Sequence, residues 1–539
     1  MSPENNAEKI QSSKELREHL LKDPYRPGYH FAVPEDVGKP GDPNGAFYAN
    51  GRYHLMYLYN RRGMRQWSGS GFCWGHISSH DLVHWRHHPD ALIPGDGDSG
   101  CYSGGGFVDD DGTAYITFWR LPLKKGDPAG TGIGIARSSD RHFDKWEKLQ
   151  VPTLDGTEWG IRQIATPMCN ADPSNIWKKD GFYYMQAGNL LVLNKFGREQ
   201  DSPAKFRGDW VDIFRSSDLI TWEYLHRFYD RNPSNRWTQE SEDDMCPSFL
   251  PLPLSRDGGE MSDKYLQLFI SHNMGCQYYI GTYARGKDKF MPENHGRMTW
   301  VDNTFFAPEA LIDQKGRQIM WAWLTDNPYG ELSDVLRAGW SGVYGLPRVL
   351  WLGDNNTLCL APVPEVNILR YNFRQFEACT VKDGAETILE NINGKSCEIK
   401  LTVDPRAAKT AGVRVRTSPD NEETTLLYYD AEREKLVLDS TASGKLGRKV
   451  LESAPLQLSE GEQLELDIFI DNSVIEVFAN DRQAITRRVY PERLDSDQVR
   501  LFCNGGPRTG DPRTGDPRNG GEATFSKIES WEMMPSNSC

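Results

Sequence analysis

Two carboxylates in this chain stand in the same local setting. Asp42 begins an Asp-Pro-Asn-Gly run and Asp172 begins an Asp-Pro-Ser-Asn run, and two short apolar runs follow each of them. The apolar runs are separated by Asn50-Gly51 and Asp180-Gly181, dipeptides that favour tight β-hairpins. Each carboxylate is therefore expected where the chain enters the first strand of a hairpin. The repetition points to catalysis by carboxylates on a repeated scaffold.

Three further hairpins and a second repeat indicate what that scaffold is. The hairpins are predicted at residues 106–118, 248–270 and 309–323. The run Ser78 to Trp85 recurs at 216–222, and more loosely at 138–146, after its hairpin in each case. Self-similarity at intervals of tens of residues indicates a propeller, solenoid or array, and long helical periodicity is missing. We therefore expect an all-β fold with a five-bladed β-propeller.

Length, charge and composition narrow the class of protein. The chain has 539 residues, which favours two domains, and its formal net charge of −14 argues against nucleic-acid or membrane partners. It contains 16 Trp and 22 Tyr, whose flat faces suit sugar rings, although packing in β-rich cores explains most of them. No run approaches the roughly 20 apolar residues of a membrane span. A neutral small molecule fits this composition best as a ligand.

The repeat pattern stops beyond Pro364, which divides the chain. We expect an N-terminal extension with a short helix over residues 1–27, the propeller over 28–364, a linker over 365–375 and a second domain over 376–539. In this last part, alternating strands at 464–470 and 474–478 flank an Asp-Asn-Ser turn. The alternation predicts an antiparallel β-sandwich that follows the propeller.

The N-terminus and the cysteines bear on location and cofactors. Residues 1–22 are polar and lack the apolar core of a secretory signal, and the ten Cys are scattered. A cytoplasmic location is therefore expected, although a secreted protein whose signal had been removed would look the same. No His, Cys and carboxylate cluster has the spacing of a metal site, so neither metal nor cofactor is expected. A homodimer is left open.

The motifs together resemble those of glycoside hydrolase family 32, the invertases, inulinases and levanases, almost from end to end. The segments that carry the resemblance are Gly41 to Gly45, residues 74–85, 101–104, 307–309, 321–323 and 345–348, and in the second domain 469–478 and 488–491. The resemblance implies a five-bladed propeller with its active site at one end of the central funnel, followed by a β-sandwich.

Roles for the carboxylates follow from the resemblance. In the family, one Asp attacks the anomeric carbon of fructose, a Glu protonates the leaving oxygen, and a second Asp holds sugar hydroxyls. Carried over by motif, Asp42 is the nucleophile and Asp172 the transition-state stabiliser. The implied activity is a retaining β-fructofuranosidase that acts on sucrose or fructo-oligosaccharides through a covalent fructosyl-enzyme. A fructosyltransferase making kestose-type products and a non-catalytic fructan-binding protein are the alternatives, while the C-terminal signature argues against a propeller arabinan or xylan hydrolase.

The sequence departs from the family at two motifs. Family members usually carry Glu directly before Cys-Pro, where this chain has Met245. We expect Glu242 to be the acid/base, with Asp243 and Asp244 as alternatives, and an acidic surface loop beside an inactive site as the opposing interpretation. The family's Arg-Asp-Pro becomes Ala-Asp-Pro around Asp172, which removes donors near the sugar, and Arg162 is a candidate to replace them.

Further side chains are expected to hydrogen-bond or stack on the sugar. They are Asn44, Trp67, Trp74, Ser103, Arg162 and Trp323. Asn44 and Ser103 rank first because they stand inside matched motifs, whereas for each Trp core packing is as well founded as sugar contact. His54 and His76 are interpreted as structural residues, because a mechanism run by carboxylates needs no imidazole.

Overall fold

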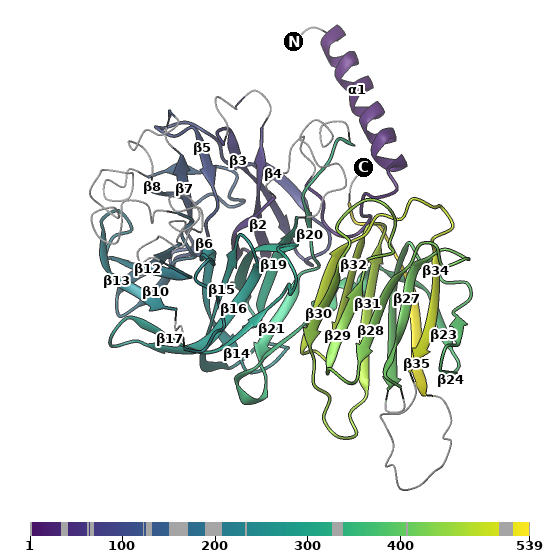
Figure 1. The fold of residues 1–539 in the computed structure, drawn as a ribbon. Helices are drawn as coiled ribbons and strands as arrows, with labels where there is room; N and C mark the ends of the chain where they lie inside the picture. The colour runs from purple at the N-terminus through teal and green to yellow at the C-terminus, as the bar shows by residue number, and fades with distance from the viewer. Residues whose placement is uncertain are drawn as a thin grey trace.

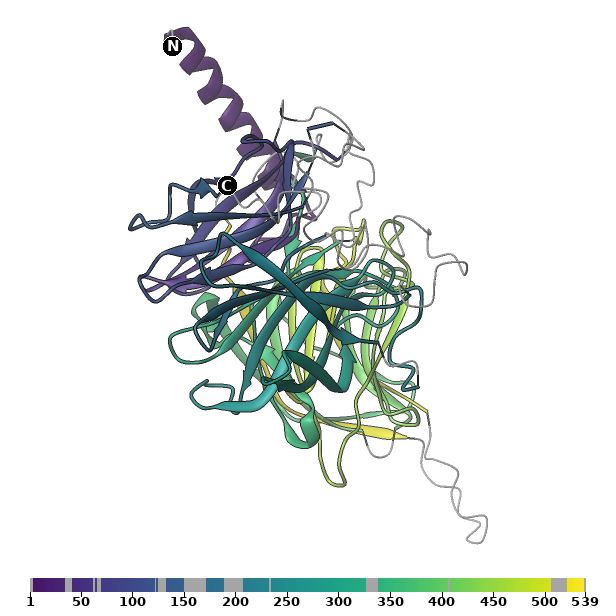
Figure 2. The same ribbon diagram turned by 90° about the vertical axis from the view of Figure 1, so that its left-hand side faces the viewer.

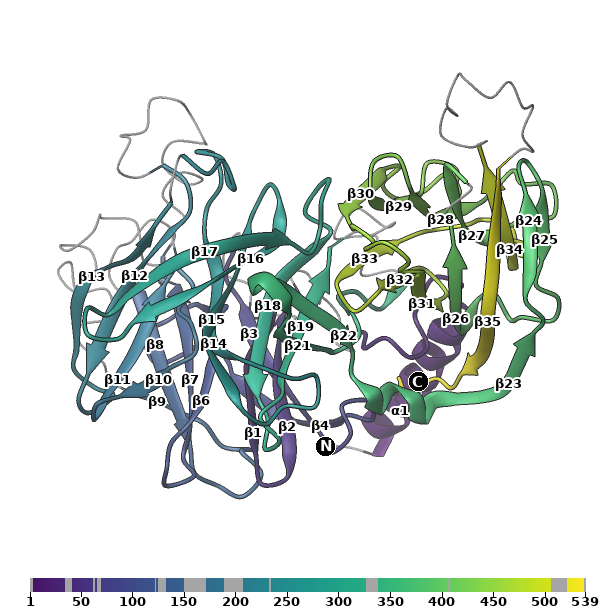
Figure 3. The ribbon, with the colours of Figure 1, turned by 90° about the horizontal axis from the view of Figure 1, so that it is seen from below.

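The computed structural model describes residues 3–33, 41–61, 64, 69–121, 123–124, 132–149, 171–188, 207–231, 234–325, 338–405, 408–505 and 521–537. A propeller and a β-sandwich lie side by side, as Figures 1 and 3 show. A long N-terminal helix projects from the body (Figures 1 and 2). Across these described ranges, no helix is both long and apolar enough to span a membrane.

The propeller has five blades, and each blade is a sheet of strands that are consecutive in the chain. Blade 1 contains β1 (Pro43–Ala49), β2 (Arg52–Asn60), β3 (Phe72–Ser79) and β4 (Arg86–Leu92). Blade 2 contains β5 (Gly100–Tyr102), β6 (Gly106–Val108), β7 (Ala114–Leu121), β8 (Gly132–Ser138) and β9 (Glu147–Lys148). Blade 3 contains β10 (Trp177–Lys179), β11 (Phe182–Ala187), β12 (Trp210–Ser216) and β13 (Trp222–Asp230).

Blade 4 contains β14 (Met245–Pro253), β15 (Met261–Ser271), β16 (Gly275–Ala284) and β17 (Lys289–Arg297). Blade 5 contains β18 (Phe305–Ile312), β19 (Gln318–Leu324), β20 (Val343–Tyr344), β21 (Arg348–Leu352) and β22 (Leu358–Pro362). The five predicted hairpins are confirmed as the antiparallel pairs β1–β2, β6–β7, β10–β11, β14–β15 and β18–β19.

The innermost strands of blades 1, 4 and 5 share one irregularity. Each shifts its register against the next strand, between Asn44 and Phe47, Met245 and Ser248, and Phe306 and Glu309. One residue inside each shift has a positive φ, namely Gly45 at 56°, Cys246 at 49° and Ala307 at 48°. Such a β-bulge bends a strand and redirects its side chains.

The repeated Ser-Asp segments form the turns between the outer strands of blades 1 to 3. Asp81, Asp140 and Asp218 each accept hydrogen bonds from backbone N–H groups two or more residues further on. The residues that follow, Leu82, Phe143 and Leu219, have φ values of 63°, 55° and 63°. The prediction that this repeat marks the outer part of each blade is confirmed.

The sandwich packs a seven-stranded sheet on a six-stranded sheet. The first sheet contains β23 (Arg370–Phe376), β24 (Cys379–Lys382), β26 (Ser396–Asp404), β31 (Leu464–Asp471), β32 (Val474–Ala479), β33 (Gln483–Arg488) and β35 (Glu522–Met533). The second contains β25 (Glu386–Ile388), β27 (Thr410–Thr417), β28 (Thr425–Asp430), β29 (Lys435–Asp439), β30 (Leu451–Pro455) and β34 (Gln498–Asn504). The predicted β31–β32 hairpin is confirmed, and Val, Ile and Leu from both sheets form the core between them.

Two predicted boundaries are wrong. The connection between the domains is a short 3-10 helix, η3 (Pro364–Leu369), and β23 already pairs with β35 from Arg370 onward. The predicted linker therefore ends earlier, because β23 is a largely exposed strand whose polar residues hide the usual alternation. A second 3-10 helix, η2 (Asp354–Asn356), precedes β22. The N-terminal helix α1 (Pro3–Lys22) is longer than the short helix expected.

The segment after α1 runs between the two domains. Ala32 forms a β-bridge with Val343 in blade 5, and the Tyr344 N–H donates to the Phe31 carbonyl over 2.9 Å. A few residues earlier, the Asp471 carboxylate of the sandwich accepts the backbone N–H groups of Gly28, Tyr29 and His30. This segment, residues 28–33, is thereby bonded to both domains.

A buried polar cluster, which we call the interdomain clamp, fixes the same place. It comprises His30, Arg348, Asp471 and Glu476. The His30 ring lies 3.0 Å from Asp471 through Nδ1 and 3.0 Å from Glu476 through Nε2. Glu476 also accepts from Arg348 over 2.6 Å, so propeller, sandwich and connecting segment meet in one network.

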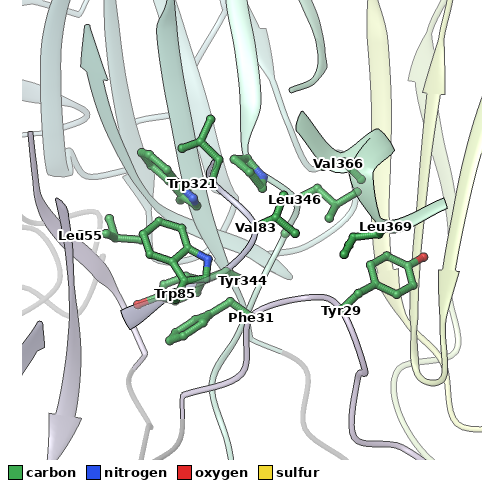
Figure 4. A pocket seen from close by; sticks show the side chains of 13 residues that line it. Tyr29, Phe31, Leu55, Val83, Trp85, Trp321, Tyr344, Leu346, Val366 and Leu369 are labelled. Atoms are coloured by element: carbon green, nitrogen blue, oxygen red, sulfur yellow. The ribbon is translucent and has the colours of Figure 1, made fainter. Parts of the chain in front are cut away.

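A small apolar cavity lies beside the clamp (Figure 4). Aromatic and aliphatic side chains line it, among them Phe31, Trp85, Trp321, Tyr344 and Leu369. Carboxylates are absent from its lining, so this cavity lacks the groups that the sequence predicts for catalysis.

Candidate active site

Asp42 and Asp172 come together where the innermost strands of blades 1 and 3 begin. Asp42 directly precedes β1, and its carbonyl accepts the Leu58 N–H of β2 over 2.9 Å. Asp172 is held in the same way, by the Gly188 N–H over 2.9 Å. The two residues are only 7% and 5% exposed, and the charge of Asp42 acts on Asp172.

Asp42 has few partners for a buried carboxylate. The Ser103 hydroxyl donates to its Oδ2 over 2.6 Å, while Oδ1 is buried and has no donor among the described residues. Burial raises the pKa of Asp42 to about 6, although the Ser103 hydrogen bond and the nearby His272 oppose the rise. Ser103, predicted to bind sugar, therefore contacts and orients the predicted nucleophile.

Asp172 has a thiol as its partner. Cys246 Sγ donates to Asp172 Oδ2 over 3.3 Å. Burial, and then the charge of Asp42, raise the pKa of Asp172 to about 7. Because the two carboxyls interact, they titrate as a pair, and near neutral pH one of them is ionised while the other holds a proton. Such a pair can combine attack on an electrophilic carbon with hydrogen bonding to a hydroxyl.

Asn44 supports Asp42 through the backbone. Its Nδ2 donates to the Asp42 carbonyl over 3.1 Å, and its Oδ1 accepts the Gly104 N–H over 3.2 Å. The side chain is almost fully buried, and both ends of the amide are bonded to the protein. The structure therefore assigns Asn44 to bracing blade 1 against blade 2, and the predicted contact with sugar gains no support.

The four other predicted binding residues differ in their outcome. Trp74 is fully buried and donates its Nε1–H to the Tyr102 carbonyl, so the predicted sugar contact is wrong and core packing is its role. Trp323 is 8% exposed and packs edge to face against Phe306, with ring centroids 6.0 Å apart. Trp67 and Arg162 lie outside the described residues.

Glu242, the predicted acid/base, is held in an ion pair. Arg297 binds both its oxygens, over 2.9 and 3.2 Å, and Gln277 donates to Oε2 over 2.8 Å. Burial by itself would raise the pKa of Glu242, but the hydrogen bonds and charge of Arg297 outweigh it and hold the pKa below its usual range. A general acid must carry a proton at the working pH, so these contacts contradict the prediction.

Met245 and Asp244 do not supply the acid either. Met245 occupies the position before Cys246 and is buried. The Asp244 carboxylate accepts the Tyr229 hydroxyl of blade 3. Burial and the charge of Asp209 raise the pKa of Asp244 well above its usual range. Gln267 also bonds to Asp244, and the charges of Asp209 and Asp243 act on it, whereas neither Asp42 nor Asp172 is among these neighbours.

Asp243 is paired with a residue that no motif indicated, His272. The His272 backbone N–H donates to Asp243 Oδ1 over 3.1 Å, and the ring Nδ1 lies within hydrogen-bond distance of Oδ2. The carboxylate is completely buried, whereas 34% of the His272 side chain is exposed. His272 is near enough to Asp42 and Asp172 to lower the pKa of both. It lies in the turn between β15 and β16, at the same end of the blade as the start of β14.

Glu309, which stands in the matched segment 307–309 and was given no role there, is a further buried carboxyl. It lies on β18, and its Oε1 accepts the Ala46 N–H of blade 1 over 2.7 Å. Burial raises the pKa of Glu309 well above its usual range. The protonated side chain therefore joins blade 5 to blade 1. Across the described ranges, no group of three or more His, Cys, Asp or Glu is arranged to hold a metal ion.

Comparison with known proteins identifies the family. The model of the glycosyl hydrolases family 32 N-terminal domain matches residues 30–362, and that of the family 32 C-terminal domain matches 365–532. The chain is 27% identical to a sucrose-6-phosphate hydrolase of Zymomonas mobilis, over 98% of this chain and 96% of that protein. It is 28% identical to a raffinose invertase of Escherichia coli, over 89% and 92% respectively.

Comparison with solved structures agrees with this result. Fructan 1-exohydrolase IIa of Cichorium intybus superposes with a TM-score of 0.78 at 22% identity, over 95% of this chain and 98% of the other. This likeness spans both the propeller and the sandwich. The chain thus belongs to glycosyl hydrolase family 32, and it is a glycoside hydrolase built from a five-bladed β-propeller and a β-sandwich.

Proposed function

We propose that this enzyme is a retaining β-fructofuranosidase that releases terminal non-reducing β-D-fructofuranosyl residues from sucrose or short fructo-oligosaccharides. The observation that carries the proposal is the buried pair of Asp42 and Asp172, whose pKa values are raised to about 6 and about 7. Membership of the family and the relatives named invertase and sucrose-6-phosphate hydrolase support the substrate class.

In the first step, the ionised Asp42 attacks the anomeric carbon of the fructosyl residue. Ser103 orients the carboxylate by donating to Oδ2, while Oδ1 has no hydrogen-bond donor among the described residues. Asp172 binds the fructosyl hydroxyls and strengthens that contact as positive charge develops on the ring. The glycosidic bond breaks and a covalent fructosyl-enzyme forms.

In the second step, water attacks the same carbon and displaces Asp42. Two displacements on opposite faces return the original configuration, so the product is β-fructose before it mutarotates. Replacement of water by a second sugar would give transfer, and the same carboxylates would serve.

The test measures release of glucose and fructose from sucrose and from 1-kestose, for the wild type and for Asp42→Asn and Asp172→Asn. We expect turnover by the wild type and loss of several orders of magnitude in both variants. Asp111→Asn, in an exposed turn of blade 2, is the matched control and should keep full activity.

Other outcomes would contradict the proposal in distinct ways. Binding of fructosides without turnover by the wild type would indicate a binding protein. Kestose-type products as the main output at high sucrose concentration would indicate a fructosyltransferase. Full activity of Asp42→Asn would exclude Asp42 as the nucleophile.

A further inference from the structure

The proposed reaction needs a proton donor that the usual motif does not provide. A sugar alkoxide is a poor leaving group, so the bridging oxygen must be protonated as the bond breaks. Met245 occupies the position before Cys246 and has no proton to give. Glu242 is held ionised by Arg297, and Asp244 is bonded to Tyr229 and Gln267.

Asp243 starts its strand at the place that Asp42 has in blade 1. The first residue that pairs again after the bulge is Phe47 in β1 and Ser248 in β14, and each lies five residues after its Asp. The strand therefore brings a carboxylate to the matching point of blade 4. That carboxylate is covered, however, and both of its oxygens bond to His272. The group placed nearer to solvent is the imidazole.

The surroundings of His272 belong to the carboxylate site. Its ring packs edge to face on Phe306, with centroids 5.7 Å apart, and Phe306 packs in the same way on Trp323. Its charge acts on Asp42, at the start of blade 1, and on Asp172, at the start of blade 3. Because Asp243 takes Nδ1, Nε2 is the ring atom that can exchange a proton with a substrate.

We propose that His272 is the acid/base of this enzyme and that Asp243 is the positioning residue that fixes its ring. The inference rests on the proposed function and deepens it. An imidazolium paired with a buried carboxylate replaces the glutamic acid that other family members place before Cys-Pro.

The proton follows a closed route. As a carboxylate oxygen of Asp42 forms its bond to the anomeric carbon, the bond from that carbon to the bridging oxygen breaks, and the Nε2 proton moves to this oxygen. The neutral imidazole then takes a proton from water while the water oxygen bonds to the anomeric carbon. Asp42 leaves as a carboxylate and His272 is an imidazolium again, so no other reactant is needed.

The decisive experiment compares two leaving groups in His272→Gln. Glucose leaves sucrose only with a proton, whereas p-nitrophenolate leaves p-nitrophenyl β-D-fructofuranoside without one. We expect kcat on sucrose to fall about 10² to 10⁴-fold, the usual contribution of a general acid. The rate of fructosylation by the aryl fructoside, measured as the burst of p-nitrophenolate, should stay within about tenfold of the wild type.

A matched control uses a second Asp-bound imidazole. His84 pairs with Asp81 over 2.8 Å in an outer turn of blade 1, and His84→Gln should leave both rates unchanged. Equal losses on both substrates in His272→Gln would overturn the proposal, since damage to folding or binding does not depend on the leaving group. Unchanged sucrose hydrolysis would overturn it as well. A wild type inactive on both fructosides, or an active Asp42→Asn, would instead remove the proposed function on which this inference rests.

Asp243 is tested by its effect on the pH profile. Asp243→Asn removes the negative charge that stabilises the imidazolium, so the alkaline limb of sucrose hydrolysis should move to lower pH. The acid limb should stay in place, because Asp42 and Asp172 keep their surroundings. An unchanged alkaline limb in a folded variant would show that Asp243 does not act through His272.

Discussion

Two buried carboxylate pairs, Asp42 with Asp172 in the propeller and Asp471 with Glu476 in the interdomain clamp, have opposite environments. Among the described residues, Asp42 and Asp172 have one side-chain donor each, Ser103 and Cys246. In the clamp, Glu476 alone accepts from His30, Arg348, Thr486 and the Leu346 N–H. Burial raises the pKa of Asp42 to about 6, whereas Arg348 and then His30 overcome burial and lower the pKa of Glu476 to about 2.

This difference in hydrogen-bond donors distinguishes carboxylates that can react with a substrate from carboxylates that stabilise the fold. A carboxylate with few donors is costly to ionise, and it remains available to a substrate that completes its contacts. A carboxylate surrounded by donors and cations is stable as an ion and has nothing left to offer a ligand. Glu242, bound by Arg297 and Gln277, belongs to the second kind, which is why acid catalysis does not suit it.

The largest expected effect comes from removing the charge of Asp42. Asp42→Asn should abolish hydrolysis of β-fructosides and at the same time stabilise the fold above pH 7. The native pKa of about 6, against an ordinary 3.8, corresponds to a cost of about 3 kcal/mol that the amide removes. This cost is absent below pH 3.8, grows as the pH rises from 3.8 to 6, and is complete above the folded pKa of about 6. Thermal unfolding at pH 4 and pH 8 checks the sign: a variant less stable than the wild type at pH 8 would contradict it.

Removing the charge of Glu476 from the clamp should lower stability and leave catalysis unchanged. Glu476→Gln leaves the Arg348 guanidinium buried without its counter-charge, which costs about 3 to 5 kcal/mol of unfolding free energy. The kcat of the folded fraction should be unchanged, because the clamp lies apart from Asp42. Urea unfolding and active-site titration measure the two quantities. A large fall in kcat with unchanged stability would contradict the assignment of stability to the clamp and of catalysis to Asp42 and Asp172.

The clamp also sets an acid limit of stability. Glu476 has a folded pKa of about 2 against an ordinary 4.5, so its contribution is complete above pH 4.5 and is lost as the pH falls towards 2. The midpoint of thermal unfolding of the wild type should therefore drop steeply across this window, and Glu476→Gln should drop less. Parallel curves for the two proteins would exclude the clamp as the source.

The smallest expected effect is that of Ser103→Ala. Loss of the hydroxyl removes the hydrogen bond that lowers the pKa of Asp42, so the acid limb of kcat/KM should move to higher pH. A hydrogen bond to a charged group contributes about 1.5 kcal/mol, so the rate below the limb should fall about tenfold. An acid limb that stays in place would separate Ser103 from the ionisation of Asp42.

Local signals were sufficient to predict the scaffold. Turn dipeptides such as Asn50-Gly51 specify a hairpin within a few residues, and alternation fixes which face of a strand is buried. The Asp42 and Asp172 pair was predictable for the same reason, since both stand at the start of such hairpins. The strand β23 was missed because its side chains are largely exposed and carry no pattern.

The rest of the site depends on contacts between distant segments. Glu242 is ionised because Arg297, 55 residues later, lies beside it. His272 stands in a turn with no motif, and only the return of β15 to the start of β14 brings it to the carboxylates. Trp74 matched a motif, yet its ring packs under Gly45 and is closed to sugar. Such pairings are decided by the packing of blades, which single-sequence patterns do not encode.

The course of residues 28–33 makes the propeller and the sandwich one mechanical unit. Every blade uses consecutive strands, so among the described residues no strand from one end of the propeller completes a blade at the other. Blades 1 and 5 are instead joined by the Ala46 N–H on Glu309 and by the bridge of Ala32 with Val343, and residues 28–30 beside this bridge are bonded to Asp471 of the sandwich. Heating should therefore produce a single cooperative transition, because unfolding of the sandwich also removes the bonds that hold residues 28–33 against the propeller.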